Sequence, residues 1–162
     1  FIQDPISLVV KNVAEVFVAK IPFHPDHPDI GSRQLKVDLT GNEAHVLVSK
    51  RDLATIEENS IIRLMELFNF KVETIEENRI AATFHSKSYE EARKLNVPLI
   101  HWIPADTGTS CRAIMPDGSK VTGVGEDALR SVHTDEIVQF ERFGFVRIDR
   151  VDEEIVAYFA HR

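Results

Sequence analysis

Alternating apolar and polar positions dominate the chain and predict short β-strands. Leu35, Val37 and Leu39 alternate with polar residues, and a Gly41-Asn42 turn follows. A period of two places successive side chains on opposite faces, as a half-buried strand requires. The pattern therefore predicts a strand that ends at this turn.

Similar patterns recur through the rest of the chain. Strands are predicted over residues 4–12, 15–21, 34–39, 44–50, 79–88, 98–104 and 110–123, the last range folding back at a Pro-Asp-Gly turn, with three closely spaced strands over 136–162. Short helical pieces are predicted over residues 50–59, 89–95 and 126–131. Many short strands separated by turns indicate an all-β barrel or sandwich.

The segment 60–78 is ambiguous. Its periodicity fits one helix, but Phe68, Phe70 and Val72 alternate and Glu77-Asn78 supplies a turn. Alternation bounded by turn residues favours strands. We therefore expect strands here also.

Composition narrows the function classes. With 162 residues and 43 % apolar residues the chain can bury a core in one domain or in two small joined ones. Its uncharged apolar runs fall far short of the roughly 20 residues that cross a bilayer, so no membrane partner is predicted. The net charge of -7 argues against indiscriminate nucleic-acid binding but leaves room for a local basic patch. The first residue, Phe1, suggests a piece of a longer polypeptide.

Few residues suggest catalysis or metal binding. The single cysteine, Cys111, excludes an internal disulfide and suits a reducing cytoplasm. His24 and His27 lie in a proline-stiffened loop without further ligands at usable spacing, so a solvated loop is favoured and no metal is predicted. An enzyme that uses His101 or Cys111 stays open as an alternative, but the residues do not predict self-sufficient catalysis.

The stretch "VQFERFGFVRID", residues 138–149, combines a predicted hairpin with side chains that can recognise bases. If Phe140 faces the core, Gln139 faces solvent, and strict alternation would bury Arg142. An unpaired buried guanidinium is costly, so we expect a turn or bulge at Phe143-Gly144 that brings Arg142 out beside Gln139. Gln and Arg can satisfy a planar, polar partner such as a splayed base; the alternative is an ion pair with Glu141 or an aspartate on the surface.

Five strings in order resemble one family. "DPISLVV", "HPDHPDIGSR", "IIRLM", "IHWIP" and "VQFERFGFVRID" are similar to the C-terminal anticodon-binding region of archaeal and eukaryotic glutamyl- and glutaminyl-tRNA synthetases. The segment between Arg51 and Arg63 is compact and acidic, which is more similar to the archaeal glutamyl enzymes. A glutaminyl-tRNA synthetase domain and a protein-interaction module remain the alternatives.

The resemblance implies an all-β fold of two closely joined six-stranded β-barrels with a few short helices. It implies a distal barrel of about residues 11–98 and a proximal barrel of about residues 1–10 and 99–162. The catalytic domain would lie outside this chain, toward the N-terminus. "FHSKS" is only superficially similar to the "KMSKS" motif of such a domain, and this chain is not expected to catalyse.

The resemblance also implies roles for four residues. Gln139 and Arg142 match a pair that contacts an anticodon base, Arg63 matches a basic position near the first anticodon nucleotide, and Arg33 is a candidate phosphate contact. The implied partners are tRNA(Glu), tRNA(Gln) as a further candidate, and the catalytic domain. The implied location is the cytoplasm. This fragment would hold no cofactor, while the complete enzyme would use ATP and Mg²⁺. Candidate rings for stacking on a base are Phe143, Phe145 and Trp102, and also Phe140, which is expected in the core.

Overall fold

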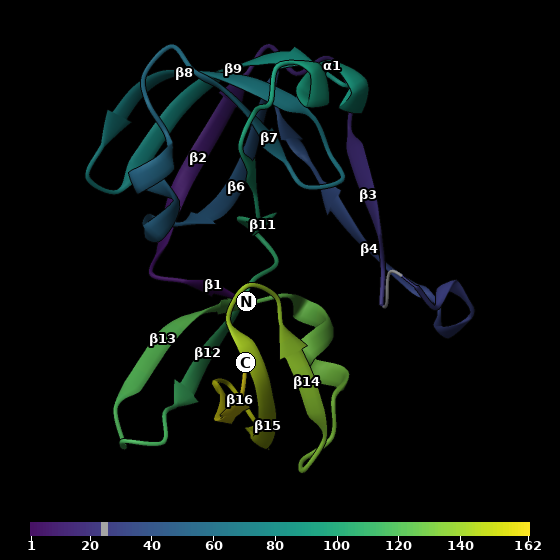
Figure 1. The fold of residues 1–162 in the computed structure, drawn as a ribbon, viewed down its shortest axis with the longest axis vertical. Coiled ribbons are helices and arrows are strands. Elements are labelled where there is room, and N and C mark those ends of the chain that lie inside the picture. Colours follow the sequence, from purple (N-terminus) through teal and green to yellow (C-terminus); the bar gives the residue numbers. More distant parts are fainter. Residues whose placement is uncertain (24–25) are drawn as a thin grey trace.

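The computed structural model describes residues 1–23 and 26–162 and is built mostly of β-strands. Two sheets are stacked along the long axis of the molecule, and both ends of the chain lie near the smaller sheet (Figure 1). One short α-helix, α1 (Tyr89–Lys94), and three short 3-10 helices are found in the described residues: η1 (Pro28–Ile30), η2 (Lys50–Thr55) and η3 (Asp127–Ser131).

The larger sheet has eight strands. Its order is β10 (Leu99–Ile100), β7 (Ile61–Leu64), β8 (Asn69–Glu76), β9 (Arg79–Ser86), β2 (Pro5–Lys11), β6 (Glu43–Ser49) and β11 (Trp102–Pro104), with β5 (Leu39–Thr40) paired to β6. Strand β2 lies between β9, to which it is parallel, and β6, to which it is antiparallel. A central position explains why the run from Leu8 to Val10 is apolar without alternation, because both of its faces are covered.

The smaller sheet has six strands. Its order is β1 (Ile2–Gln3), β13 (Lys120–Gly125), β12 (Thr109–Ile114), β16 (Ile155–His161), β15 (Gly144–Val151) and β14 (Ile137–Phe140). The three closely spaced strands predicted over residues 136–162 are β14, β15 and β16, which form an antiparallel meander, and β12 pairs in parallel with β16. A separate ribbon of β3 (Phe17–Pro22) and β4 (Ser32–Val37) extends beside the two sheets (Figure 1).

Two hydrophobic clusters match the two sheets. The larger surrounds Trp102, Phe68 and Phe70, which are all at most 1 % exposed. The smaller contains Phe140 with Val146 and Ile148. No helix in the described residues is long and apolar enough to cross a membrane.

These observations confirm the mostly β fold and change its details. The segment 60–78 forms strands β7 and β8, as expected. The smaller sheet has six strands and the larger has eight, of which β5, β10 and β11 are only two or three residues long. In the described residues the two end strands of each sheet do not pair with each other, so the strand order does not close on itself. The smaller sheet forms a half-barrel rather than a closed barrel. Residues 5–10 and 99–104, expected in the proximal unit, pair with the larger sheet.

Candidate nucleic-acid interface

The turn between β14 and β15 releases Arg142 from the strand alternation. Phe140 pairs with Gly144, and the Phe143 N–H donates to the Phe140 carbonyl at 2.9 Å, which leaves Glu141, Arg142 and Phe143 as the turn. Arg142 has φ of +61°, a left-handed conformation that this turn position normally reserves for Gly or Asn. The break predicted next to Gly144 is therefore confirmed, and it brings the guanidinium to the surface.

Arg142 is exposed and paired at the same time. Its side chain is 49 % exposed, and its Nη2 donates to Oδ1 of Asp52 at 2.8 Å. The Asp52 carboxylate lies in η2, directly after a strand of the larger sheet, and is only 4 % exposed. Arg142 thus remains reachable from solvent while an acid of the other sheet holds it.

Gln139 and Arg142 both line a groove of about 530 Å³, which is formed mostly by the smaller sheet and receives Arg51 from η2. The groove contains three cationic side chains, two amides and two aromatic rings; its lining residues are Gln3, Arg51, Met115, Val121, Gln139, Arg142, Phe143, Gly144, Phe159 and Arg162. A smaller cavity of about 230 Å³ shares Gln3, Arg51, Arg142 and Phe143 with it. Directed donors beside aromatic rings are what a protein needs to hold an unpaired base.

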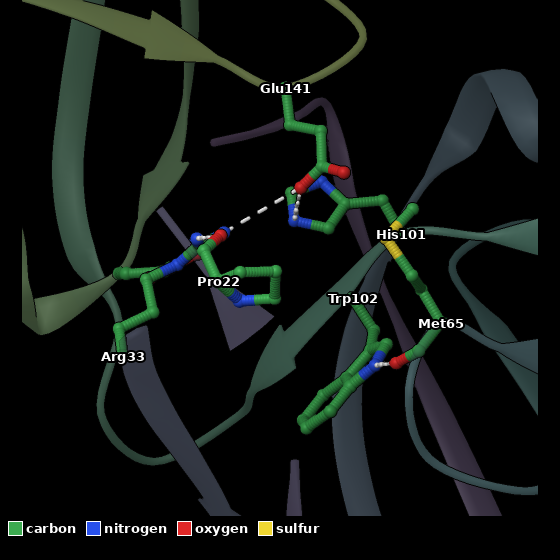
Figure 2. Close-up of polar contacts among 7 residues, drawn as sticks. Pro22, Arg33, Met65, His101, Trp102 and Glu141 are labelled. Carbon is green, nitrogen blue, oxygen red and sulfur yellow. Dashed lines mark hydrogen bonds and ion pairs between the residues drawn. The ribbon is translucent and has the colours of Figure 1, made fainter. Parts of the chain in front are cut away.

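The aromatic side chains divide into buried and accessible ones. Phe140 is 2 % exposed and Trp102 is 1 % exposed. The Trp102 indole N–H is also occupied, since it donates to the Met65 carbonyl at 2.8 Å (Figure 2). Phe143 lines the groove, and Phe145 stacks on His161 with ring centroids 4.8 Å apart. Of the four rings considered, Phe143 is the one placed beside Gln139 and Arg142 in the groove.

Glu141, the neighbour of Arg142, faces the other way into a polar cluster. Figure 2 shows its carboxylate between the His101 ring and the Arg33 guanidinium. Its Oε2 lies 3.6 Å from His101 Nε2 and 3.6 Å from Arg33 Nη2, while Arg33 Nε lies 2.7 Å from a carboxylate oxygen of Glu126. Burial, with help from cations that include Arg33 and Arg142, lowers the pKa of His101 to about 3. The ring is therefore neutral at physiological pH.

Arg63 lies in a different part of the larger sheet. It is 7 % exposed, and its Nη1 donates to Asn69 Oδ1 at 2.9 Å and to the Lys87 carbonyl at 3.3 Å. Its guanidinium carbon lies 5.5 Å from the centroid of the Tyr89 ring, and burial lowers its pKa. Neither Arg63 nor Arg33 lines the groove. The structure thus brings together two of the four predicted residues and separates the other two from them.

The remaining candidate for nucleophilic chemistry is enclosed. Cys111 is fully buried, and burial raises the pKa of its thiol to about 12, so the thiolate is scarce at neutral pH. Within the described residues no group of three or more His, Cys, Asp or Glu could hold a metal ion. His24 and Pro25 lie outside those residues.

Sequence reasoning missed several residues of this site. Asp52 was part of a segment described only as acidic, and Gln3, Arg51 and Arg162 were not singled out. The adjacency of Arg51 and Asp52 after a strand was the one local signal. Their approach to Arg142 depends on how the two sheets meet, which a local pattern does not show.

A mostly β chain with a groove of arginine, glutamine and phenylalanine side chains has the features of proteins that bind unpaired nucleotides. Residues 1–89 match the family described as "tRNA synthetases class I (E and Q), anti-codon binding domain", and residues 99–149 match a second family model with the same description. The chain belongs to this anticodon-binding family, which confirms the resemblance carried by the five motifs.

The relatives are archaeal. Proteins named glutamate–tRNA ligase are 44 % identical over 167 residues in Pyrococcus abyssi, 43 % over 166 residues in Thermococcus onnurineus and 40 % over 163 residues in Methanocaldococcus jannaschii. Each match covers 100 % of this chain but only 28 % of the relative. The chain therefore spans little more than a quarter of the length of these ligases.

Proposed function

We propose that this chain reads the anticodon of tRNA as the C-terminal part of a glutamate–tRNA ligase, which attaches glutamate to tRNA(Glu) with ATP. The family match and the names of the relatives support this function over the glutaminyl alternative. ATP, Mg²⁺ and the chemical steps belong to a catalytic domain elsewhere in the polypeptide. In the family the two sheets correspond to two barrel-like units, and we retain that two-barrel arrangement as part of the proposal.

The groove suggests how one base is recognised. A glutamate or glutamine anticodon has a central uridine, whose O2 and O4 accept hydrogen bonds and whose N3–H donates one. Gln139 offers a donor and an acceptor, and Arg142 offers donors only, so the pair can satisfy a uracil. Cytosine presents a donor amine in place of O4, and such a mismatch costs about 1–3 kcal/mol. Phe143, which lines the groove and packs edge-on against Phe159, is the proposed ring for stacking on the base, a contact worth about 1–3 kcal/mol.

Arg63 and Arg33 would act outside this groove. We propose that Arg63 supports the surface near the first anticodon nucleotide, where it already holds Tyr89 and the segment before α1. A phosphate contact by Arg33 would require it to exchange one of its carboxylate partners, Glu126 or Glu141. The tRNA(Gln) partner remains part of this proposal, because the central uridine is common to both anticodons.

The observation that carries the proposal is the shared groove of Gln139 and Arg142, and binding to altered tRNA tests it. In the full-length ligase, Arg142→Ala should weaken binding of a tRNA(Glu) transcript with a central uridine roughly 5- to 150-fold. It should weaken binding of a transcript with a central cytidine much less. Fluorescence anisotropy with both transcripts gives the two dissociation constants.

Two further variants make the result interpretable. Arg142→Ala leaves the buried Asp52 without its partner, which destabilises the fold. Arg142→Lys keeps the positive charge but removes the planar fork, so it should lose base discrimination with less damage to stability. Arg150→Ala removes an exposed arginine of the same hairpin and should leave both affinities unchanged. Equal losses against both transcripts would show that Arg142 contacts only phosphate.

A further inference from the structure

The Arg142–Asp52 contact differs from an ordinary surface ion pair. Pairs between two exposed side chains contribute little, because water competes for both partners. Here the acid is 4 % exposed, and its second oxygen, Oδ2, is buried without a hydrogen-bond partner among the described residues. A buried carboxylate strongly favours a cation beside it, so Asp52 restrains Arg142 more firmly than an exposed acid would.

This restraint crosses the boundary between the sheets. Asp52 lies 90 positions before Arg142 in sequence, in the short helix η2 that follows a strand of the larger sheet. Arg142 lies in the β14–β15 turn of the smaller sheet. The position of the guanidinium is therefore set by both sheets rather than by its turn alone.

The contact leaves most of the guanidinium available. Only Nη2 donates to Asp52, and no hydrogen bond donated by Nη1 or Nε is found within the described residues. An arginine on a turn has many rotamers, and ordering them on binding would weaken affinity. A side chain that is already held at the groove loses less conformational freedom and presents its remaining donors in one direction.

We propose that Asp52 is a positioning residue for base recognition: by holding Arg142 Nη2, it aims the remaining N–H groups of the guanidinium into the groove and so sets the preference for the central base. This inference rests on the proposed anticodon function. The competing possibility is that Asp52 only ties the two sheets together, in which case its removal would weaken binding of all tRNAs alike.

A double-mutant cycle in the full-length ligase separates these roles. The variants are Asp52→Asn, Arg142→Ala and the double variant, each tested with transcripts that carry a central uridine or a central cytidine. Asp52→Asn has nearly the same shape and leaves the half-exposed Arg142 in water, so it should fold. We expect it to reduce the ratio of the two dissociation constants roughly 3- to 30-fold, and to have no further effect on that ratio once Arg142 is absent.

Two further variants serve as controls: one removes an acidic charge elsewhere, and the other shifts the carboxylate at position 52. Asp152→Asn removes an exposed acid of the smaller sheet, paired with Arg150, and should leave the ratio unchanged. Asp52→Glu keeps the charge but displaces the carboxylate by one methylene, so it should lower the ratio if position matters; it also serves if Asp52→Asn fails to fold.

The outcomes of the double-mutant cycle distinguish positioning by Asp52 from a purely structural role. A reduced ratio that depends on Arg142 supports positioning by Asp52. If Asp52→Asn weakens binding of both transcripts equally and lowers the melting temperature, or if it changes neither dissociation constant, the positioning role is wrong while the proposed function stands. If Arg142→Ala itself shows no base-dependent loss, base recognition by Arg142 and this inference both fall, while the family match that supports the proposed function remains.

Discussion

Two buried residues, His101 and Cys111, have their proton equilibria set by the loss of water around them. Burial favours the uncharged form of each group, which lowers the pKa of the imidazole and raises that of the thiol. Both groups are therefore uncharged at neutral pH.

His101 should make stability depend on pH. Its pKa is about 3 in the folded chain and about 6.5 when unfolded, so between these values the unfolded state binds the extra proton. Stability is therefore complete above pH 6.5 and falls as the pH decreases, by about 1.4 kcal/mol per pH unit. The His101→Gln variant has no imidazole at this position, so its unfolded state cannot bind this extra proton. Urea unfolding of both proteins at pH 7, 6 and 5 should show curves that converge or cross toward low pH; parallel curves would contradict this.

The residues of the groove were only partly predictable. Gln139 and Arg142 could be predicted because alternation would have buried a guanidinium, and the cost of that burial required a turn. Asp52 could not, since a carboxylate in a polar segment is normally solvated. Asp52 is instead buried, and its ion-pair partner lies in a turn 90 residues away.

At the level of elements, Gly144 is required where the turn enters β15. It has φ of +146°, and a Cβ there would lie 2.7 Å from Phe159 Cε2 and 2.8 Å from the His161 carbonyl oxygen. The carbonyl belongs to the backbone of the neighbouring strand, so it cannot move aside without shifting the sheet. A side chain at this position would displace the turn that carries Arg142.

We expect Gly144→Ala to lower the free energy of unfolding by about 1–3 kcal/mol more than a matched change elsewhere. Gly118→Ala is that match, because Gly118 also has positive φ, +82°, but nothing lies within 4 Å of its Cβ position. Chemical denaturation measures both. Similar losses in the two variants would mean that only backbone conformation matters at Gly144.

The strands themselves follow from local pattern, and their partners do not. Alternation identified β8 and β9, and turn residues marked the limits of the meander β14–β15–β16. The parallel pairings of β2 with β9 and of β12 with β16 join segments distant in sequence, so no local signal specifies them. Residues 5–10, expected with the proximal barrel, pair through β2 with β6 and β9 of the larger sheet.

For the molecule as a whole, the net charge of -7 limits how RNA can be bound. An acidic protein gains little from diffuse attraction to phosphates, so binding must rely on a few localised cations such as those of the groove. Under the proposed function, the same acidity would disfavour RNAs that do not place a base in the groove, and specificity would depend on base contacts more than on charge.

Salt dependence tests this balance in the full-length ligase. Each phosphate contact to single-stranded RNA contributes about -0.7 to the slope of log K against log salt. If Arg33 contacts phosphate, Arg33→Gln should make the slope shallower by about 0.7, whereas Arg142→Ala should weaken affinity without changing the slope. Arg150→Gln is the matched exposed control and should change neither quantity. A slope near zero for wild-type protein would contradict RNA binding and favour the protein-interaction module, whose association does not release phosphate counterions.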